Sequence, residues 1–110
     1  MPLVKLFAQR SMHKPIPLAK LQSALCEIWK TQPNTTKLIL FRVDDWTDES
    51  FKEDVYVDIR AKATPDRKPE NILDGMQRVQ QAFKNENLIA NVRLETYAGP
   101  QYFHLPPSDS

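Results

Sequence analysis

The second residue of the chain carries a nitrogen whose chemistry depends on its covalent state. Pro2 follows Met1 and stands directly before an apolar run. If Met1 is removed, the Pro2 nitrogen becomes a secondary amine at the start of a strand. An α-amino group has an unperturbed pKa of about 8, and partial burial or neighbouring cations lower that pKa further. We therefore treat Pro2 as a candidate general base, although proline is also a common second residue without any catalytic role.

Three cations stand where they could accompany such a base. Arg10 follows the first expected strand and Arg67 follows the third, both at strand-to-helix junctions where ligands collect in α/β proteins. Arginine suits the bidentate capture of carboxylates. Lys37 opens the second expected strand, and in a β-α-β unit this position lies beside Pro2. Each cation alone is best explained as a solvated surface residue. The expected position of all three near Pro2, however, predicts a site for a small carboxylate.

Three aromatic side chains are candidates for the walls of that site. Trp46 and Phe51 lie in a polar segment without clear periodicity, and Tyr97 ends the last expected strand. Such residues would keep the proline nitrogen dry and its pKa low. Aromatic residues near strand ends are, however, more often ordinary packing.

Histidine, cysteine and glycine predict neither a metal site nor a phosphate loop. His13 and His104 have no metal-ligand spacing with each other or with Cys26, which we expect to be a small core residue. Gly75 and Gly99 are the only glycines, so no glycine-rich phosphate loop exists. We therefore expect a protein that works without a metal or another cofactor.

The composition favours one soluble domain over residues 1–110 with no basic surplus. Fifteen Lys and Arg against 14 Asp and Glu give a formal net charge of +1, which predicts no nucleic-acid or membrane partner. A single cysteine excludes an internal disulfide framework, and the start of the chain lacks the pattern of a secretory signal. We expect a cytoplasmic location.

Hydrophobic periodicity predicts an α/β (α+β) fold built from two consecutive β-α-β units. Right-handed crossovers place both helices on one face of a four-stranded sheet. We expect the units over 2–44 and 54–97, a loop over 45–53, and a C-terminal flap and tail over 98–110, with Tyr102 to Leu105 docking as the flap. The expected strands are 3–8, 37–43, 54–62 and 88–97, and the expected helices are 17–30 and 69–85.

The first two strands are apolar toward both faces of the sheet, which has a consequence for assembly. A monomer would leave a large apolar surface exposed, so we expect self-association through the face without helices. Charged residues of mixed sign on that face could pair there or line a solvated centre. These residues are Asp58, Arg60, Arg93 and Glu95.

Short segments across nearly the whole chain resemble the tautomerase superfamily. Arg42–Trp46 and Tyr56–Lys62 are similar to segments of 5-carboxymethyl-2-hydroxymuconate isomerase, and Arg67 falls where that family has an arginine opening its second helix. Lys37 replaces a family arginine, which keeps the charge and loses the bidentate geometry. Arg10 with its following serine resembles the Arg-Ser after the first strand of 4-oxalocrotonate tautomerase. The loop after Trp46 is shorter and more acidic than in the family, and the segment beyond Tyr97 has no match.

The resemblance implies a homotrimer whose sheets pack into a central barrel, with sites at subunit boundaries. It implies a cofactor-free keto-enol tautomerase or isomerase of a small 2-oxo or 2-hydroxymuconate-type carboxylic acid. In such an enzyme Pro2 removes a proton α to the carbonyl, while Arg67 and Lys37 hold a carboxylate or stabilise the enolate oxygen. The implied substrate-binding residues are Arg10, Trp46, Phe51 and Tyr97.

Two other functions stay open. One is a non-catalytic trimeric binding or signalling protein, like the macrophage migration inhibitory factor branch of the same superfamily. The other is a ferredoxin-like small binding module, which shares the order of strands and helices. A ferredoxin-like monomer would expose one face of its sheet, which the two-sided apolar strands do not suit.

Overall fold

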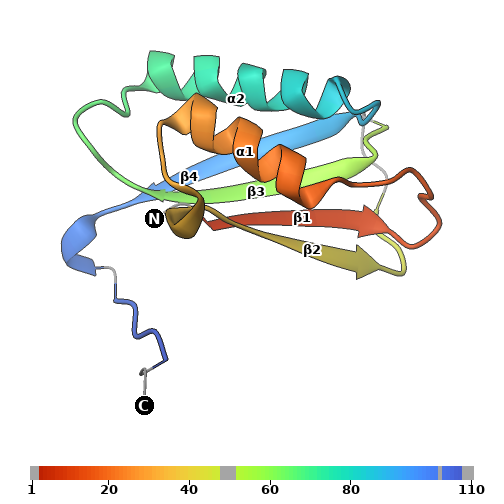
Figure 1. The fold of residues 1–110 in the computed structure, drawn as a ribbon, viewed down its shortest axis with the longest axis horizontal. Coiled ribbons are helices and arrows are strands. Elements are labelled where there is room, and N and C mark those ends of the chain that lie inside the picture. The colour runs from red at the N-terminus through yellow and green to blue at the C-terminus, as the bar shows by residue number, and fades with distance from the viewer. Residues whose placement is uncertain (1–2, 48–51, 102, 108–110) are drawn as a thin grey trace.

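The computed structural model describes residues 3–47, 52–101 and 103–107, and its helices and strands follow the order of two β-α-β units (Figure 1). Two short 3-10 helices, η1 (Pro33–Thr35) and η2 (Gly99–Gln101), precede β2 and follow β4. The main elements are β1 (Leu3–Gln9), α1 (Leu18–Trp29), β2 (Lys37–Val43), β3 (Val55–Lys62), α2 (Pro69–Lys84) and β4 (Ala90–Tyr97).

The predicted element boundaries agree with the structure to within two residues. The largest difference is the start of β4, which we expected at Leu88 and which begins at Ala90. Asn87 adopts a left-handed conformation with φ 61°, and the Leu88 amide still donates to the carbonyl of Phe83 at the end of α2. Leu88 is therefore a buried core residue in the connection rather than part of the strand.

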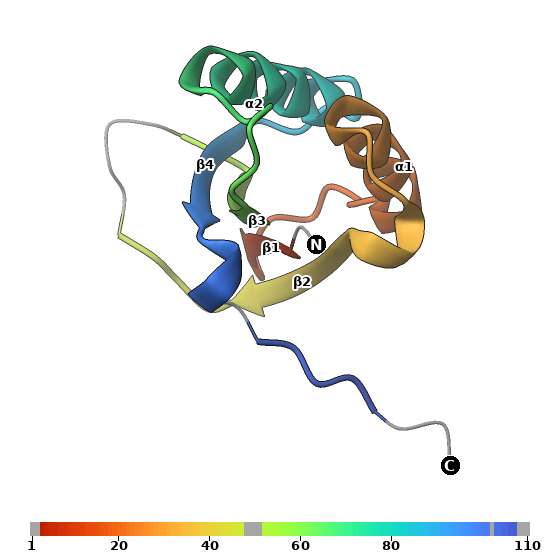
Figure 2. The same cartoon turned by 90° about the vertical axis from the view of Figure 1, so that its left-hand side faces the viewer.

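The sheet has the strand order β2-β1-β3-β4, with both helices on one side of it (Figures 1 and 2). β1 pairs in parallel with β2 and antiparallel with β3, and β3 pairs in parallel with β4. The two strands of each β-α-β unit are thus direct neighbours. In the ferredoxin-like fold another strand separates them. This order confirms the predicted architecture and excludes the ferredoxin-like alternative.

The core lies between the sheet and the helices, where alternate strand residues meet one face of each helix. Burial alternates along β1 and along β3, as a strand with one covered face requires. α2 carries its buried side chains on one stripe, and its Phe83 is fully buried. Burying one such large apolar side chain stabilises the fold by about 1.5–3 kcal/mol. The fully buried strand residues include Val4, Leu6, Val55, Val57 and Ile59.

The two helices pack closely where Gly75 of α2 meets the indole of Trp29 at the end of α1. A Cβ atom at position 75 would lie 2.3 Å from the nearest Trp29 ring carbon. Only a residue without a side chain allows this approach. Among the described residues, no helix has both the length and the apolar character needed to cross a membrane.

The opposite face of the sheet, which we call the open face, carries no helix (Figure 2). An aromatic row crosses it, with Phe7 stacked on Phe41 at 5.0 Å between ring centroids and edge-on to Tyr56 at 6.5 Å. Phe41 is 39% exposed. The mixed charges of this face pair across β3 and β4, as Asp58 with Arg93 and as Arg60 with Glu95.

The C-terminal segment does not pack on the sheet as the expected flap would. After η2 the chain runs away from the body on the side opposite the helices (Figures 1 and 2). Phe103 is 88% exposed and Leu105 is 95% exposed, while Tyr102 lies outside the described residues. The turn of η2 directs the chain outward at the end of β4, so these apolar side chains find no cover within the subunit.

Candidate active site

The two ends of the sheet differ in their chemistry. We call the end where β1 and β2 begin and β3 and β4 finish the Lys37 end. The opposite end, where β1 and β2 finish and β3 and β4 begin, is the Trp46 end. β1 has 7 residues, and at roughly 3.3 Å per residue the two ends lie roughly 20 Å apart. Residues at different ends of one subunit therefore cannot contact the same small ligand.

Lys37 stands at the first position of β2, directly opposite Leu3 of β1. The next residue toward the N-terminus is Pro2, which lies outside the described residues. Strand alternation puts Lys37 on the open face, together with Phe41 of the same strand. Lys37 is exposed, so its ammonium group is accessible to a ligand at this end.

Tyr97, a predicted pocket wall, also lies at the Lys37 end, where it pairs in register with Lys62. Its half-buried ring lies under the guanidinium of Arg60, 5.8 Å from the ring centroid. Arg60 in turn stands opposite Leu3 from the β3 side. The sequence analysis did not place Arg60 or Lys62 in the site, because the antiparallel pairing of β1 with β3 is not readable from local patterns.

Arg67 lies at the same end but on the helix side of the sheet. Its backbone amide donates to the Thr64 carbonyl, and its guanidinium donates to the carbonyl of Lys62. The side chain lines a cavity of about 590 Å³ between the end of α1 and the start of α2, together with Trp29 and Arg78. Lys37 and Arg67 therefore share an end of the sheet and not a face.

Arg10 lies at the Trp46 end and not near Lys37. Its amide donates to the Val43 carbonyl, and its guanidinium forms an exposed ion pair with Asp44 at 2.8 Å. Because β1 and β3 are antiparallel, the residues that follow them lie at opposite ends of the sheet. The structure thus separates Arg10 from Arg67 within one subunit.

Trp46 lines a cavity of about 310 Å³ on the open face, with Phe7 and Tyr56 as further aromatic walls. Phe51, the other aromatic residue predicted for this region, lies outside the described residues. The cavity also contains Glu53, whose Oε2 is buried and has no hydrogen-bond partner among the described residues. The sequence analysis missed Glu53, Phe7 and Tyr56. Glu53 is one of several acidic residues in a mixed polar segment, and no sequence pattern around it indicates a site.

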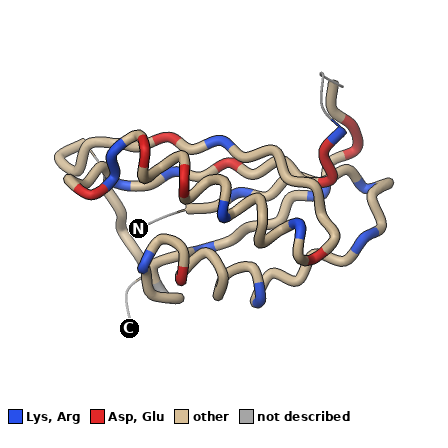
Figure 3. The backbone as a smooth tube through the Cα atoms, turned by 90° about the horizontal axis from the view of Figure 1, so that it is seen from above, with Lys and Arg blue, Asp and Glu red and all other residues tan. Residues whose placement is uncertain are grey.

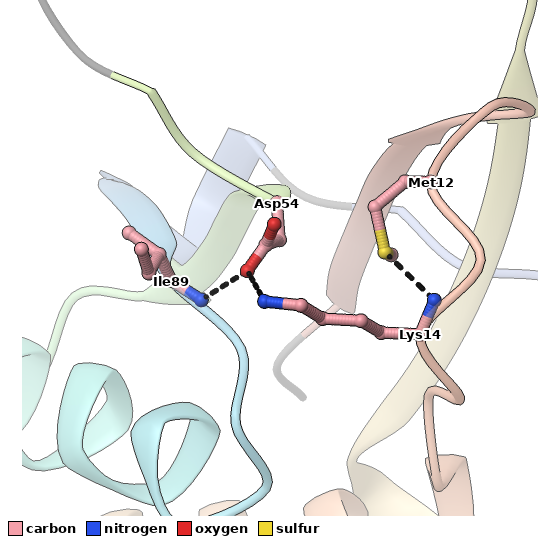
Figure 4. Close-up of polar contacts among 4 residues, drawn as sticks. All are labelled: Met12, Lys14, Asp54 and Ile89. Atoms are coloured by element: carbon pink, nitrogen blue, oxygen red, sulfur yellow. Dashed lines mark hydrogen bonds and ion pairs between the residues drawn. The ribbon is translucent and has the colours of Figure 1, made fainter.

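Acidic residues flank the connection between β2 and β3 at the Trp46 end, as Figure 3 shows beside the grey trace. Asp54 is held through its Oδ2, which accepts from the Lys14 ammonium at 3.0 Å and from the Ile89 amide at 2.9 Å (Figure 4). The Lys14 amide also contacts the Met12 sulfur at 3.3 Å, which fixes the connector after β1. The acidic residues described here are Asp44, Asp45, Glu53 and Asp54.

Several cations gather among the described residues of the Lys37 end, and one of them, Arg60, pairs with Glu95 at 3.8 Å. Farther along the open face, a hydrogen bond to the Tyr56 hydroxyl raises the pKa of Arg93, and the charge of Asp58 raises it further. In the part of the chain that the structure describes, no group of three or more His, Cys, Asp or Glu residues is placed to hold a metal ion. The cations at the Lys37 end include Lys37, Arg60, Lys62 and Arg67.

No protein-family model matches the sequence, and no curated protein matches it. Solved structures do match. Native fused 4-OT has a TM-score of 0.73 at 8% identity, over 93% of this chain and 91% of that chain. Malonate semialdehyde decarboxylase has a TM-score of 0.62 at 10% identity, over 96% and 92%. A DUF1904 domain from Sebaldella termitidis has a TM-score of 0.64 at 13% identity, over 94% and 95%.

The chain has the tautomerase fold. Structures that share it include tautomerase-superfamily enzymes as well as proteins described only as domains of unknown function. Identities of 8% to 14% among them show the fold alone. The particular likeness to 5-carboxymethyl-2-hydroxymuconate isomerase therefore stays a prediction from the sequence. Within the tautomerase fold, the Lys37 end is the place where the described residues gather cations around the start of β1.

Proposed function

We propose that this protein is a cofactor-free keto-enol tautomerase or isomerase of a small 2-oxo or 2-hydroxymuconate-type carboxylic acid. After removal of Met1, the Pro2 nitrogen takes a proton from the carbon α to the substrate carbonyl and returns it at another position. Lys37 and Arg67 bind the carboxylate or stabilise the negative charge that develops on the enolate oxygen. Arg10, Trp46, Phe51 and Tyr97 complete the substrate site.

One observation carries this proposal: the register that sets Lys37 opposite Leu3, the residue after Pro2. Backbone hydrogen bonds between two paired strands hold this register. A cation fixed at the end of a strand gives a substrate anion a constant position relative to the adjacent nitrogen. Nearby positive charges also favour the neutral amine over its protonated form, which is the form that accepts a proton.

Arg10 and Trp46 reach such a site only if two copies contribute to it, since they lie at the other end of the subunit. We propose a homotrimer in which the Lys37 end of one copy meets the Trp46 end of the next. Contacts between unlike ends of identical copies form a closed ring when the rotation between the copies closes. The uncovered aromatic row of Phe7 and Phe41 supplies apolar surface for this association.

Two preparations of the same chain test the role of the Pro2 nitrogen. One begins at Pro2, as verified by intact mass, and the other retains an N-terminal extension that makes this nitrogen an amide. We expect the first preparation to accelerate the ketonisation of phenylenolpyruvate and the extended one to lose that activity by about 100-fold or more. Equal rates in the two preparations would overturn the proposal.

A further inference from the structure

We propose that Arg60 of β3 binds the carboxylate of the substrate in a bidentate manner, which leaves Lys37 to stabilise the enolate oxygen. This inference rests on the proposed function and gives separate roles to two cations of its substrate site. Arg60 and Lys37 stand on either side of Leu3, because β1 pairs with β2 and with β3 at this residue. Two cations therefore border the start of β1, one on each neighbouring strand.

Arg60 and Lys37 also share a face of the sheet. Burial alternates along β3, where Ile59 and Ala61 are buried on the helix side and Arg60 is exposed on the open face. Lys37 is likewise exposed at the start of β2. Neighbouring strands lie about 4.8 Å apart, so the backbones of the two cations are roughly 10 Å apart with β1 between them. Their long side chains can therefore reach one small ligand above Leu3.

Three other arginines stand in different places. Arg67 lines the cavity on the helix side of the sheet, and Arg10 lies at the Trp46 end. Arg93 lies on β4, which β3 separates from β1. Arg60, in contrast, shares both the end and the face of Lys37, so it is suited to bind the same substrate molecule.

The ion pair that Arg60 makes with Glu95 is weak enough for a substrate to replace it. The Arg60 Nε lies 3.8 Å from the Glu95 Oε1, and both side chains are more than half exposed. Exposed ion pairs contribute little to stability, because water screens the two charges. A substrate carboxylate can therefore take the place of Glu95 at the guanidinium without loss of a strong contact.

Tyr97 limits where the guanidinium of Arg60 can lie. The guanidinium is positioned over the half-buried Tyr97 ring, 5.8 Å from the ring centroid. This distance is within the range of a cation–π interaction. In this arrangement Tyr97 serves the substrate site through Arg60, as a positioning residue.

The two cations suit different oxygens of a 2-oxo acid. The planar guanidinium of arginine presents parallel N–H donors that match the two oxygens of a carboxylate. The ammonium of lysine is a compact point charge, which suits the single oxygen on which negative charge develops. The carboxylate keeps its charge throughout the reaction, so its binding stabilises the substrate and the transition state equally. Loss of Arg60 should therefore raise KM and leave kcat nearly unchanged.

Steady-state kinetics with phenylenolpyruvate and with its methyl ester, which lacks the anionic carboxylate, test the proposal. We expect Arg60→Gln to raise KM for the acid by about tenfold or more, with kcat changed by less than about threefold. KM for the ester should not change. Arg60→Lys keeps the charge without the bidentate geometry, so its KM for the acid should lie between those of the parent and Arg60→Gln.

Two further variants separate the role of Arg60 from that of its neighbours. Glu95→Gln breaks the same ion pair and is the matched control, and we expect it not to raise KM for the acid. Tyr97→Leu should raise KM for the acid in the parent and have no further effect in Arg60→Gln, because Tyr97 acts through Arg60. Equal increases of KM in Arg60→Gln and in Glu95→Gln would overturn the proposal, since the ion pair would then matter and not the guanidinium.

The failure of this inference is distinguishable from the failure of the proposed function. An active parent with the same KM for the acid as Arg60→Gln would overturn the role of Arg60 and leave the tautomerase intact. A parent without ketonisation activity would contradict the proposed function. Calorimetry with phenylpyruvate would then decide on Arg60, since we expect about tenfold weaker binding to Arg60→Gln. If Arg60→Gln fails to fold, an unchanged KM for the acid in Arg60→Lys would overturn the bidentate role.

Discussion

Lys37 and Leu3 lie opposite each other where β2 and β1 begin, in the parallel register that continues to Val43 and Gln9. This pairing brings residues 34 positions apart in the sequence side by side. It also puts a lysine ammonium group at the end of the strand that follows Pro2. The proposed active site depends on this pairing more than on any other contact within the subunit.

Replacement of Lys37 tests whether its charge serves catalysis. We expect Lys37→Ala to lower kcat/KM for phenylenolpyruvate ketonisation by about 100-fold, because a charge that stabilises the enolate is lost. Lys37→Arg should retain most of the activity, since arginine keeps the charge and adds bidentate geometry. Lys84→Ala, at an exposed position in the last turn of α2, should behave like the parent. An unchanged kcat/KM in Lys37→Ala would remove this lysine from the mechanism.

Charge on the open face should prevent assembly. We expect Phe41→Asp to convert the oligomer to monomer in sedimentation velocity, because Phe41 stacks on Phe7 in the uncovered aromatic row. Leu73→Asp is the matched control, since Leu73 is 60% exposed on α2 and lies on the other side of the sheet. A parent protein that sediments as a monomer would contradict the proposed trimer, as would an oligomer that Phe41→Asp leaves intact.

Gly75→Ala should destabilise the fold although alanine favours helices. The better helix propensity contributes up to about 1 kcal/mol, but the new Cβ would overlap the Trp29 ring. Overpacking of this kind costs about 1–3 kcal/mol. We expect urea denaturation to give a lower free energy of unfolding for Gly75→Ala than for the parent. In the Trp29→Leu background, where the ring is absent, adding Gly75→Ala should not lower the free energy of unfolding further. A stabilised Gly75→Ala would show that α1 and α2 pack less closely than described.

The ion pair between Lys14 and Asp54 should matter less than the carboxylate itself. Lys14→Met removes a partly exposed pair at 3.0 Å, so we expect a loss of about 0–1 kcal/mol in the free energy of unfolding. Asp54→Ala removes the same ion pair and also the acceptor of the exposed Ile89 amide, so we expect a loss of about 0.5–1.5 kcal/mol beyond that of Lys14→Met. Chemical denaturation measures both values, and equal losses would contradict the separate role of the amide contact.

The sequence predicted the helices and strands from local hydrophobic patterns, and it predicted the adjacency of the parallel strands from their β-α-β connections. Leu6, for example, alternates with half-buried neighbours along β1, as the pattern of β1 requires. The position of Arg10 relative to Arg67 could not be read in the same way. It depends on the antiparallel pairing of β1 with β3, which joins residues far apart in the chain.

The side-chain environment at the Trp46 end was also beyond local patterns. Trp46 lines a cavity in the structure, and its role as a wall of the substrate site stays a prediction. Glu53 lines the same cavity as Tyr56, and neither charge nor spacing in the sequence indicates that one of its carboxylate oxygens is buried. The prediction of a C-terminal flap was wrong for a similar reason. An apolar residue such as Phe103 suggests packing, but the sequence does not identify the surface on which it would pack.

The kinetics of Pro2→Ala test the central claim most directly. The variant must have the circular dichroism spectrum and the oligomeric state of the parent, and intact mass must show that Met1 is removed from it. The account predicts that kcat/KM for phenylenolpyruvate ketonisation falls by about 100-fold or more, because the secondary amine that acts as general base is gone. A Pro2→Ala protein with the kcat/KM of the parent would contradict the account.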